Sequence, residues 1–393
     1  MALTFILLTV FIDMLGLGIL IPVLPFVVRQ FSESALTLGL LSMSFALFQF
    51  FAAPILGRLS DRHGRRPLLL MSLFGSGLGY VLFGLAHSLV LLFIARIVDG
   101  ITGGNVSIAQ AYIADVTEPK NRSRNFGLLG AAFGMGFIIG PAIGGTLSHF
   151  WGLSAPAFFA AGLAFANTAL GFFVLPETRP AEKRTHVRMT FRSLNPIAGV
   201  LRGMRHEHLG SIFLAIFAFN LAFSGLQSNF SLFTLVKFHW GPQENAILFS
   251  VIGIVSAITQ AGIVRRLVKT YRDQTIAVTG LLVQTGSYLF TAFVPTAALV
   301  YVASAVTSFG VGITQPTLSG IVSNSVSDQE QGAMLGTTQS VAALTRIIGP
   351  LWAGFAFDWL GPGAPYWSGA ILIGIAAALV LRARPRTHHH APA

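Results

Sequence analysis

Four charged residues stand inside long apolar stretches of this 393-residue sequence: Asp13, Arg96, Asp99 and Arg346. A charged side chain at the centre of a bilayer costs roughly 2.5 to 3.5 kcal/mol or more, so a charge kept there is a functional candidate. Arg96 and Asp99 are three residues apart and share one face of a helix. Two neighbouring carboxylates beside an arginine can bind and release a proton when their surroundings change.

The depth of the two acids follows from the helical rise. At about 1.5 Å per residue, Asp13 lies about 14 Å and Asp99 about 15 Å from one end of its segment, near the middle of a core of about 30 Å. We expect an acid pair beside Arg96, with one acid binding the proton. The alternative is a static ion pair between Arg96 and either acid. Arg346 would bind an anionic group or pair with an acid, Asp358 included.

Other reactive chemistry has little support in the sequence. The chain has no cysteine, and His63, His149 and His388–His390 fall in expected loops or the tail. No cluster of His and acids has metal-ligand spacing, and there is no nucleophile elbow or phosphate-binding loop. We therefore expect no enzyme activity, no cofactor and no bound metal.

The composition indicates the type of secondary structure that holds the four charged residues. Hydrophobic residues make up 53% of the chain and charged residues 10%, where soluble domains carry about 25%. Apolar segments long enough to span a bilayer recur throughout, which predicts an all-α integral membrane protein. The predicted spans are 4–28, 35–57, 67–87, 89–112, 125–147, 155–175, 209–232, 245–264, 275–293, 298–322, 333–356 and 364–381.

The basic residues indicate the orientation. The net charge is +11, and Lys and Arg gather in alternate connections, whereas the opposite side holds only Arg29 and Lys237. By the positive-inside rule both termini are cytoplasmic. This bias explains the charge without nucleic acid. The first segment lacks a basic region before it, so it is read as a span and not as a cleavable signal.

An internal repeat divides the chain. Ile138-Ile-Gly-Pro141 in the fifth span recurs as Ile347-Ile-Gly-Pro350 in the eleventh. One long polar connection separates six spans from six. We therefore predict two six-helix bundles related by a pseudo-twofold axis. Their bounds are 1–175 and 209–381, with a cytoplasmic connection at 176–208 and a cytoplasmic tail at 382–393.

The connection after the second span carries a specific motif. Gly57-Arg-Leu-Ser-Asp61-Arg62-His-Gly-Arg65-Arg66-Pro67 resembles the G-x-L-x-D-R-x-G-R-R motif of the major facilitator superfamily. The resemblance implies that Asp61 faces the start of the eleventh helix, where a carboxylate is favoured. It also implies that Arg65 meets Asp115 at the end of the fourth span. Together with Gly57 and Arg62, these residues would form a conformational latch.

Two further segments narrow the resemblance. Gly130-x-x-x-Gly134-x-Gly136-x-x-x-Gly140-Pro141-x-x-Gly144-Gly145 is similar to the fifth span of the drug/proton antiporters. Glycines four apart let helices approach closely, and Pro141 bends the helix. The first span and the segment Arg96–Asp115 resemble the tetracycline-efflux subgroup. The chain departs from that subgroup at Gln284, which replaces an acid, and at Asp99, which replaces a small residue.

The spans also carry amides that could contact a substrate. The candidates, together with Arg346, are Asn220, Gln227, Asn229, Gln284 and Gln315. A large apolar pocket with a few amides suits a bulky lipophilic compound, although amides in spans also join helices.

The resemblance implies a proton-driven exporter of small lipophilic compounds that works by alternating access. We expect a monomer in the cell inner (plasma) membrane whose partners are the substrate, protons and lipid. The alternatives are a proton-coupled importer of a sugar or organic acid and, in another class, a membrane sensor that moves nothing.

Overall fold

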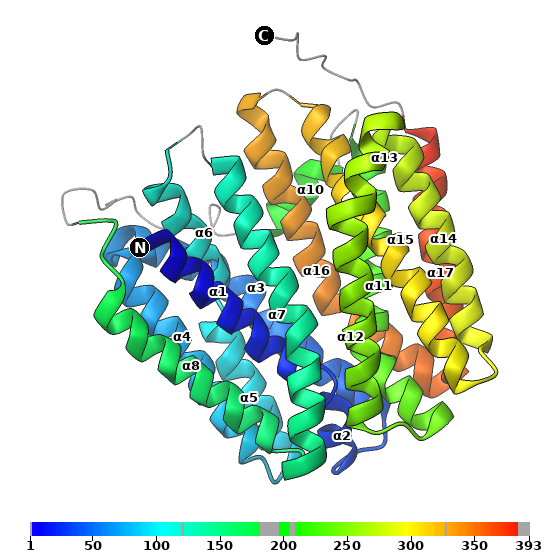
Figure 1. The fold of residues 1–393 in the computed structure, drawn as a ribbon, viewed down its shortest axis with the longest axis horizontal. Helices are drawn as coiled ribbons and strands as arrows, with labels where there is room; N and C mark the ends of the chain where they lie inside the picture. The colour runs from blue at the N-terminus through cyan, green and yellow to red at the C-terminus, as the bar shows by residue number, and fades with distance from the viewer. Residues whose placement is uncertain (1, 119–121, 181–195, 205–208, 327, 384–393) are drawn as a thin grey trace. The chain divides into compact units, whose positions relative to one another are not determined.

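The computed structural model describes residues 2–118, 122–180, 196–204, 209–326 and 328–383. Within these ranges the secondary structure is helical, and no strand occurs. Figure 1 shows the helices in chain order. The tail after Ala383 and most of the predicted connection at 176–208 lie outside the described residues.

The described helices follow one another along the chain. They are α1 (Ala2–Leu20), α2 (Leu24–Arg29), α3 (Ala35–His63), α4 (Arg65–Gly84), α5 (Leu89–Thr102), α6 (Asn105–Val116), α7 (Arg122–Trp151), α8 (Ala155–Val174), α10 (Pro196–Met204), α11 (Gly210–Phe238), α12 (Pro242–Ile258), the π-helix η3 (Thr259–Val264), α13 (Arg265–Thr270), α14 (Asp273–Phe293), α15 (Ala297–Asn324), α16 (Asp328–Leu360) and α17 (Ala364–Arg382).

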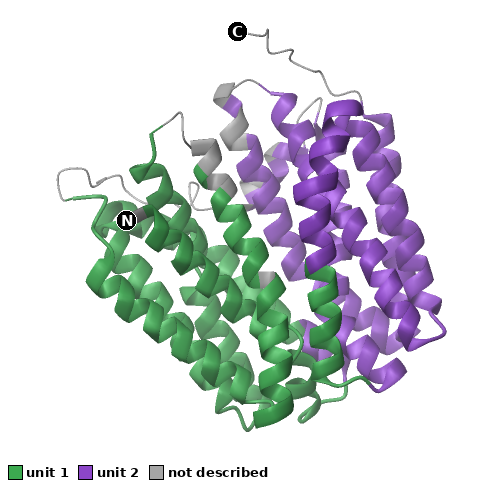
Figure 2. Cartoon of the chain, in the orientation of Figure 1, with its two compact units in different colours: residues 1–33, 40–194, 240–253 green, residues 34–39, 195–239, 254–393 purple. Residues whose placement is uncertain are grey.

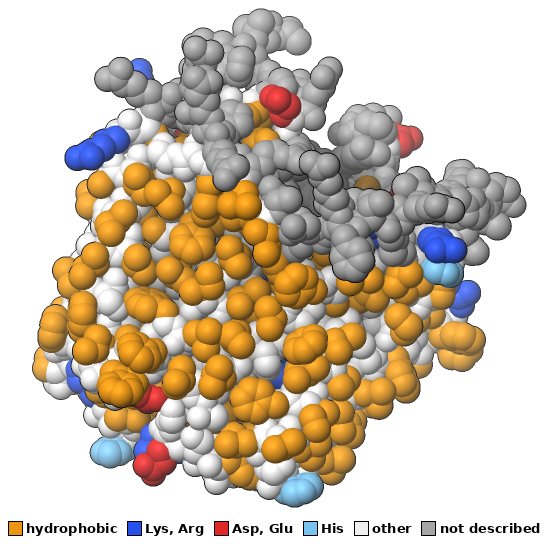
Figure 3. Space-filling model, turned by 180° about the vertical axis from the view of Figure 1, so that it is seen from behind, with side chains coloured by type: hydrophobic (Ala, Val, Ile, Leu, Met, Phe, Trp, Pro, Cys, Tyr) orange, Lys and Arg blue, Asp and Glu red, His pale blue; other side chains and the backbone are white. Residues whose placement is uncertain are grey.

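The described helices form 12 segments long and apolar enough to cross a membrane, which confirms the predicted number of spans. Hydrophobic side chains dominate the face drawn in Figure 3. Large apolar side chains such as Phe173 and Phe293 are 83% and 72% exposed. Exposed apolar side chains in such number are expected where the solvent is lipid.

Two predicted spans are interrupted. The first was predicted to continue to residue 28, but α1 ends at Leu20 and α2 starts at Leu24. The reason lies in the prolines: Pro22 cannot donate a backbone hydrogen bond, and Pro25 occupies the first turn of α2. The fourth was predicted to be continuous, but Gly103 and Gly104 separate α5 from α6.

The helices form two compact units, coloured in Figure 2. Unit 1 comprises residues 1–33, 40–194 and 240–253, and unit 2 comprises 34–39, 195–239 and 254–393. The units differ from the predicted bundles because residues 34–39 belong to unit 2 and residues 240–253 belong to unit 1.

Local contacts explain both exchanged segments. In unit 2, the Asp358 carboxylate accepts hydrogen bonds at 2.8 and 2.9 Å from the backbone amides of Ala35 and Leu36, at the start of α3. In unit 1, α12 packs on α7, where a side chain at Gly145 would collide with Ala246.

Three glycines of the fifth span, Gly136, Gly140 and Gly144, bring α7 close to α1, whereas Gly130 and Gly134 of the same pattern contact no other described segment within 4 Å. A Cβ at Gly136 would stand 2.7 Å from Met14 Cβ, and one at Gly140 would stand 2.7 Å from Gly18 Cα. Pro141 lies within α7. Because Met14 follows Asp13, this contact fixes the position of the first acid.

We predict that Asp358→Ala destabilises the chain by about 0.5–2 kcal/mol, because the first amides of α3 lose their acceptor. The midpoint of thermal unfolding in detergent measures this loss. Asp358→Asn is the control, since its amide oxygen still accepts a hydrogen bond. An unchanged midpoint for Asp358→Ala would contradict the capping role.

Candidate functional site

Arg96 and Asp99 form a buried ion pair on one face of α5. Arg96 Nη1 lies 3.0 Å from Asp99 Oδ2, and the two residues are 8% and 3% exposed. The guanidinium also lies 4.2 Å from the centre of the Phe45 ring, and the Ser76 hydroxyl hydrogen-bonds to Asp99. Two groups, the Arg96 guanidinium and the Ser76 hydroxyl, thus favour the charged form of the buried Asp99.

Asp13 has different surroundings. Its side chain on α1 is half-buried, and Asn105 Nδ2 donates a hydrogen bond of 2.7 Å to Asp13 Oδ1. No ion pair of Asp13 occurs among the described residues. Its closest polar partner is therefore a neutral amide.

Close helix contacts hold the two acids near each other. A Cβ at Gly79 of α4 would stand 2.8 Å from Asp99 Cβ, and one at Gly16 of α1 would stand 3.1 Å from the Tyr80 hydroxyl. Tyr80 is within electrostatic range of Asp13, Asp99 and Arg96, and the two carboxylates also interact with each other. The structure thus brings the three predicted charges of unit 1 into one cluster and adds Asn105, Ser76 and Tyr80.

We predict that Asp99→Asn destabilises the chain far more than Asp13→Asn. The first change leaves the buried Arg96 without its counter-charge, and breaking a buried pair costs about 3–5 kcal/mol. The second leaves a neutral amide facing the Asn105 amide. Thermal unfolding of both variants in detergent tests this contrast. Equal midpoints would contradict it.

A second group of charges links α3, α4 and α6. Arg65, which is 5% exposed, lies 2.6 Å from Asp61 and 3.0 Å from Asp115. Arg65 Nη1 also donates to the Ser60 hydroxyl at 2.6 Å and, at 3.4 Å, to the Gly57 carbonyl. The contact that the resemblance implied between Arg65 and Asp115 is present. Arg62 is exposed.

One prediction about this motif is wrong. We expected residues 57–67 to form a connecting loop, but α3 runs to His63 and α4 starts at Arg65. Gly64 alone joins them, with a φ of 106°. Because glycine adopts a positive φ without steric cost, one residue suffices to turn the chain.

The segment after α8 completes this network. Glu177 accepts hydrogen bonds from the backbone amides of Arg65 and Arg66, at 2.8 and 3.2 Å, and so caps α4. Arg179 forms an ion pair with Asp61. Neither residue was among the predicted site residues, because no local pattern indicates which element they contact. Their only signal is that they are the first charges after the sixth span.

The predicted substrate residues of unit 2 lie in different environments. Gln284 is fully buried and donates hydrogen bonds to the Thr314 hydroxyl at 2.9 Å and the Gly280 carbonyl at 3.2 Å, so it joins α14 to α15. Asn229 is also fully buried, and neither end of its amide has a hydrogen-bond partner in the described part of the chain. The other amides are partly buried in Asn220 and Gln227 and exposed in Gln315.

Arg346 is exposed on α16, and no ion pair is found for it in the described part of the chain. Asp358 is not its partner. That carboxylate binds the start of α3 and the Ser34 hydroxyl, at 2.6 Å, more than three helical turns from Arg346.

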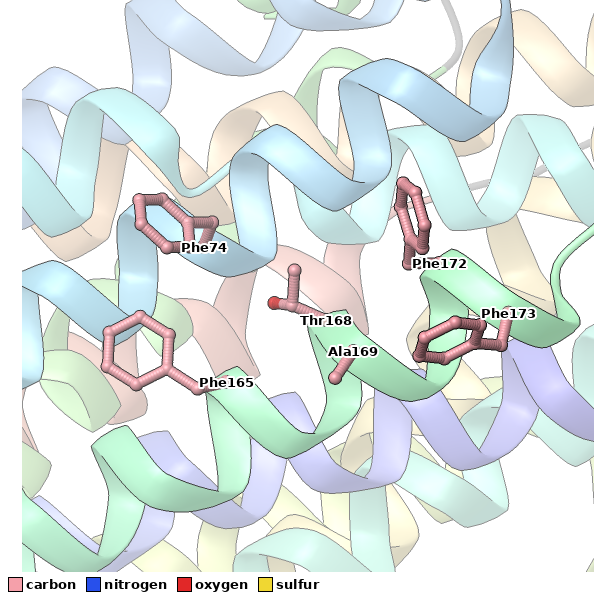
Figure 4. Close-up of a pocket in the computed structure, with 6 residues that line it drawn as sticks. All are labelled: Phe74, Phe165, Thr168, Ala169, Phe172 and Phe173. Atoms are coloured by element: carbon pink, nitrogen blue, oxygen red, sulfur yellow. The ribbon is translucent and has the colours of Figure 1, made fainter.

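An open groove between α4 and α8 offers no comparable chemistry. Figure 4 shows its six lining residues: Phe74, Phe165, Thr168, Ala169, Phe172 and Phe173. The one polar side chain, Thr168, donates its hydrogen bond to Ala164 of its own helix, at 2.8 Å. The groove is therefore an apolar surface suited to lipid chains.

Comparison with known proteins links this arrangement to one family. The profile of the Major Facilitator Superfamily matches residues 6–350 and 267–393. The chain is 33% identical over 383 residues to the tetracycline resistance protein, class C, of Escherichia coli, covering 96% of this chain and 95% of the relative. It is 29% identical over 354 residues to multidrug resistance protein 2 of Bacillus subtilis (strain 168), with coverages of 89% and 87%.

Solved structures share the fold. The human organic anion transporter MFSD10 (TETRAN) matches with a TM-score of 0.73 at 26% identity, over 96% of this chain and 98% of that one. A bacterial homolog of the human lysosomal transporter Spinster, inward-facing and occupied, matches with a TM-score of 0.77 over 97% and 96%. At 15% identity this second match bears on the fold alone.

Proposed function

The chain belongs to the major facilitator superfamily, and on that premise we propose that it is a proton-coupled exporter of small lipophilic compounds. Relatives named for resistance to tetracycline and to multiple drugs support export of drug-like molecules. Transport by alternating access agrees with two units built from helices.

The observation that carries proton coupling is the pair of carboxylates within apolar spans. Asp13 and Asp99 lie in α1 and α5 and interact electrostatically beside Arg96. An acid kept at this depth is costly unless its charge is used. Binding a proton neutralises it, and losing the proton restores the charge, so the two states favour different surroundings.

The proposed substrate class is based on the few polar side chains within the apolar spans. Asn220 and Gln227 present partly buried amides, and Gln315 and Arg346 are exposed on α15 and α16. We propose these residues and Asn229 as contacts for a compound that is largely apolar. The resemblance to the tetracycline exporters implies an acid where this chain has Gln284, which is engaged with Thr314, so we propose a substrate other than tetracycline.

The membrane location is part of the proposal. The relatives from Escherichia coli and Bacillus subtilis support a bacterial inner (plasma) membrane. The gathering of Lys and Arg in alternate connections supports cytoplasmic termini. We propose that the monomer is the transporting unit.

The test uses the purified full chain in acid-loaded proteoliposomes. Lipophilic drugs, tetracycline among them, are added outside while proton efflux is recorded. Efflux triggered by a drug, and absent from empty vesicles, is the expected result. If no drug in a broad panel moves protons, export by antiport is contradicted, and the same vesicles then test uptake of sugars and organic acids.

A further inference from the structure

The two acids of the proposed proton site differ in their partners. Asp99 is 3% exposed and pairs with Arg96 at 3.0 Å. An arginine stays charged and has only donors, so it favours a carboxylate over a carboxylic acid. Asp13 is half-buried and faces the amide of Asn105. Only Asp13 therefore combines partial exposure with a neutral partner.

The Asn105 amide can form a hydrogen bond with Asp13 both as a carboxylate and as a carboxylic acid. Asn105 is 3% exposed, and its Nδ2 donates to Asp13 Oδ1 at 2.7 Å. Its Oδ1 is buried without a hydrogen-bond partner among the described residues. Nothing therefore fixes which end of the amide faces Asp13. Rotation of the amide by about 180° presents the oxygen, which accepts from a carboxylic acid as the nitrogen donates to a carboxylate.

The break between α5 and α6 in the fourth span determines the position of the Asn105 amide. Asn105 is the first residue of α6, directly after Gly103 and Gly104. Gln49 of α3 donates to the Gly103 carbonyl at 3.1 Å and so binds a backbone group freed by the break. A Cβ at Gly104 would stand 2.6 Å from Leu56, so the chain passes close to α3 at this point. Interrupted helices in transporters commonly carry ion sites.

The charged groups around Asp13 are few. Asp99, the partner of Arg96, faces it from α5, and the titratable Tyr80 faces it from α4. Of the other helices packed on α1, α8 has no charged residue, and α7 has only Arg122, Arg124 and His149 near its ends. The contact on α6 is the neutral Asn105.

We propose that Asn105 is a positioning residue that holds Asp13 in both protonation states, so that Asp13 carries the coupled proton while Asp99 remains the counter-ion of Arg96. This inference rests on the proposed proton coupling. In this role the Asn105 side chain must both donate and accept a hydrogen bond, so an apolar side chain that packs equally well cannot replace it.

The experiment compares Asn105→Leu with Asn105→Ser and Asn167→Leu in proteoliposomes. The serine hydroxyl still donates and accepts, so it serves as the conservative rescue. Asn167→Leu is the matched control, because Asn167 is 1% exposed and hydrogen-bonds to Thr9 of the same helix α1 at 3.3 Å. Each variant is assayed for drug-triggered proton movement across a pH series. Infrared difference spectra of the purified protein record carboxyl protonation separately.

Asn105→Leu is expected to displace the pH profile by about one unit toward alkaline pH, because the hydrogen bond lost from the anion is the stronger one. Asn105→Ser restores the profile, and Asn167→Leu leaves its midpoint in place. The carboxyl band is expected to vanish in Asp13→Asn and persist in Asp99→Asn.

Coincident profiles for Asn105→Leu and wild type would overturn the inference, as would a carboxyl band lost only in Asp99→Asn. Failure of the proposed function is recognised separately: wild-type vesicles would then move no protons with any drug, whereas the infrared band still assigns the titrating acid.

Discussion

Asp13→Asn is expected to abolish drug-triggered proton movement, down to the level of empty vesicles, while the protein still binds drug. The change removes the group that accepts the proton but leaves the Asn105 amide a polar partner at 2.7 Å. It also leaves the pair of Arg96 and Asp99 intact. Proton flux in acid-loaded proteoliposomes and drug binding by the detergent-solubilised protein are the two measurements.

Asp13→Glu is the control for this expectation. It keeps a carboxyl group near Asn105 and retains measurable coupling, at a lower rate because the longer side chain misplaces the acid. A variant Asp13→Asn that still moved protons in response to drug would remove Asp13 from the transport cycle. Loss of drug binding and proton movement together would instead indicate a structural defect, which thermal unfolding detects.

The sequence predicted the cluster of Asp13, Arg96 and Asp99 because charges in apolar segments are rare enough to stand out. Arg96 and Asp99 pair as their spacing of three residues suggested. Asn105 was not among the predicted residues for a physical reason: an amide within an apolar segment commonly joins helices, and the contact of Asn105 with Asp13 depends on a helix break. Gly103 and Gly104 lie among apolar residues, so hydropathy gives no sign of the break.

The motif at residues 57–67 shows a similar division. The meeting of Arg65 with Asp115 was expected from the resemblance, whereas the contributions of Glu177 and Arg179 were not. These two residues lie more than 100 positions along the chain from their partners, and no local pattern encodes such a contact.

The amides of unit 2 show the limit of periodicity in a membrane protein. Helices that are apolar on every side have no pattern that separates a face toward lipid from a face toward another helix. Gln284 is fully buried against Thr314, whereas Gln315 is exposed, although both are glutamines in apolar spans. Packing between segments distant in sequence decides which amide joins helices and which stays exposed.

Arg65→Ala is expected to slow transport strongly and to destabilise the chain, because Arg65 joins three helices. Its guanidinium lies within 3.0 Å of both Asp61 and Asp115, and removing one partner of a buried ion pair costs about 3–5 kcal/mol. Since its partners are 34% and 27% exposed, we expect the lower end of that range. Arg65→Lys keeps the charge but loses the planar fork, so its effect is intermediate.

The matched control for Arg65→Ala is His63→Ala, in the same motif but exposed. It is expected to leave both the initial rate of drug-triggered proton movement and the unfolding midpoint close to wild type. The exchanged pair, Arg65→Asp with Asp115→Arg, tests whether the ion pair itself matters, because its partial recovery over either single variant gives a coupling energy of about 0.5–3 kcal/mol. If the network acts as a latch, the exchanged pair must also recover the transport rate over that of either single variant. Recovery of stability alone would make the network a structural joint between α3, α4 and α6, with no part in the change of access.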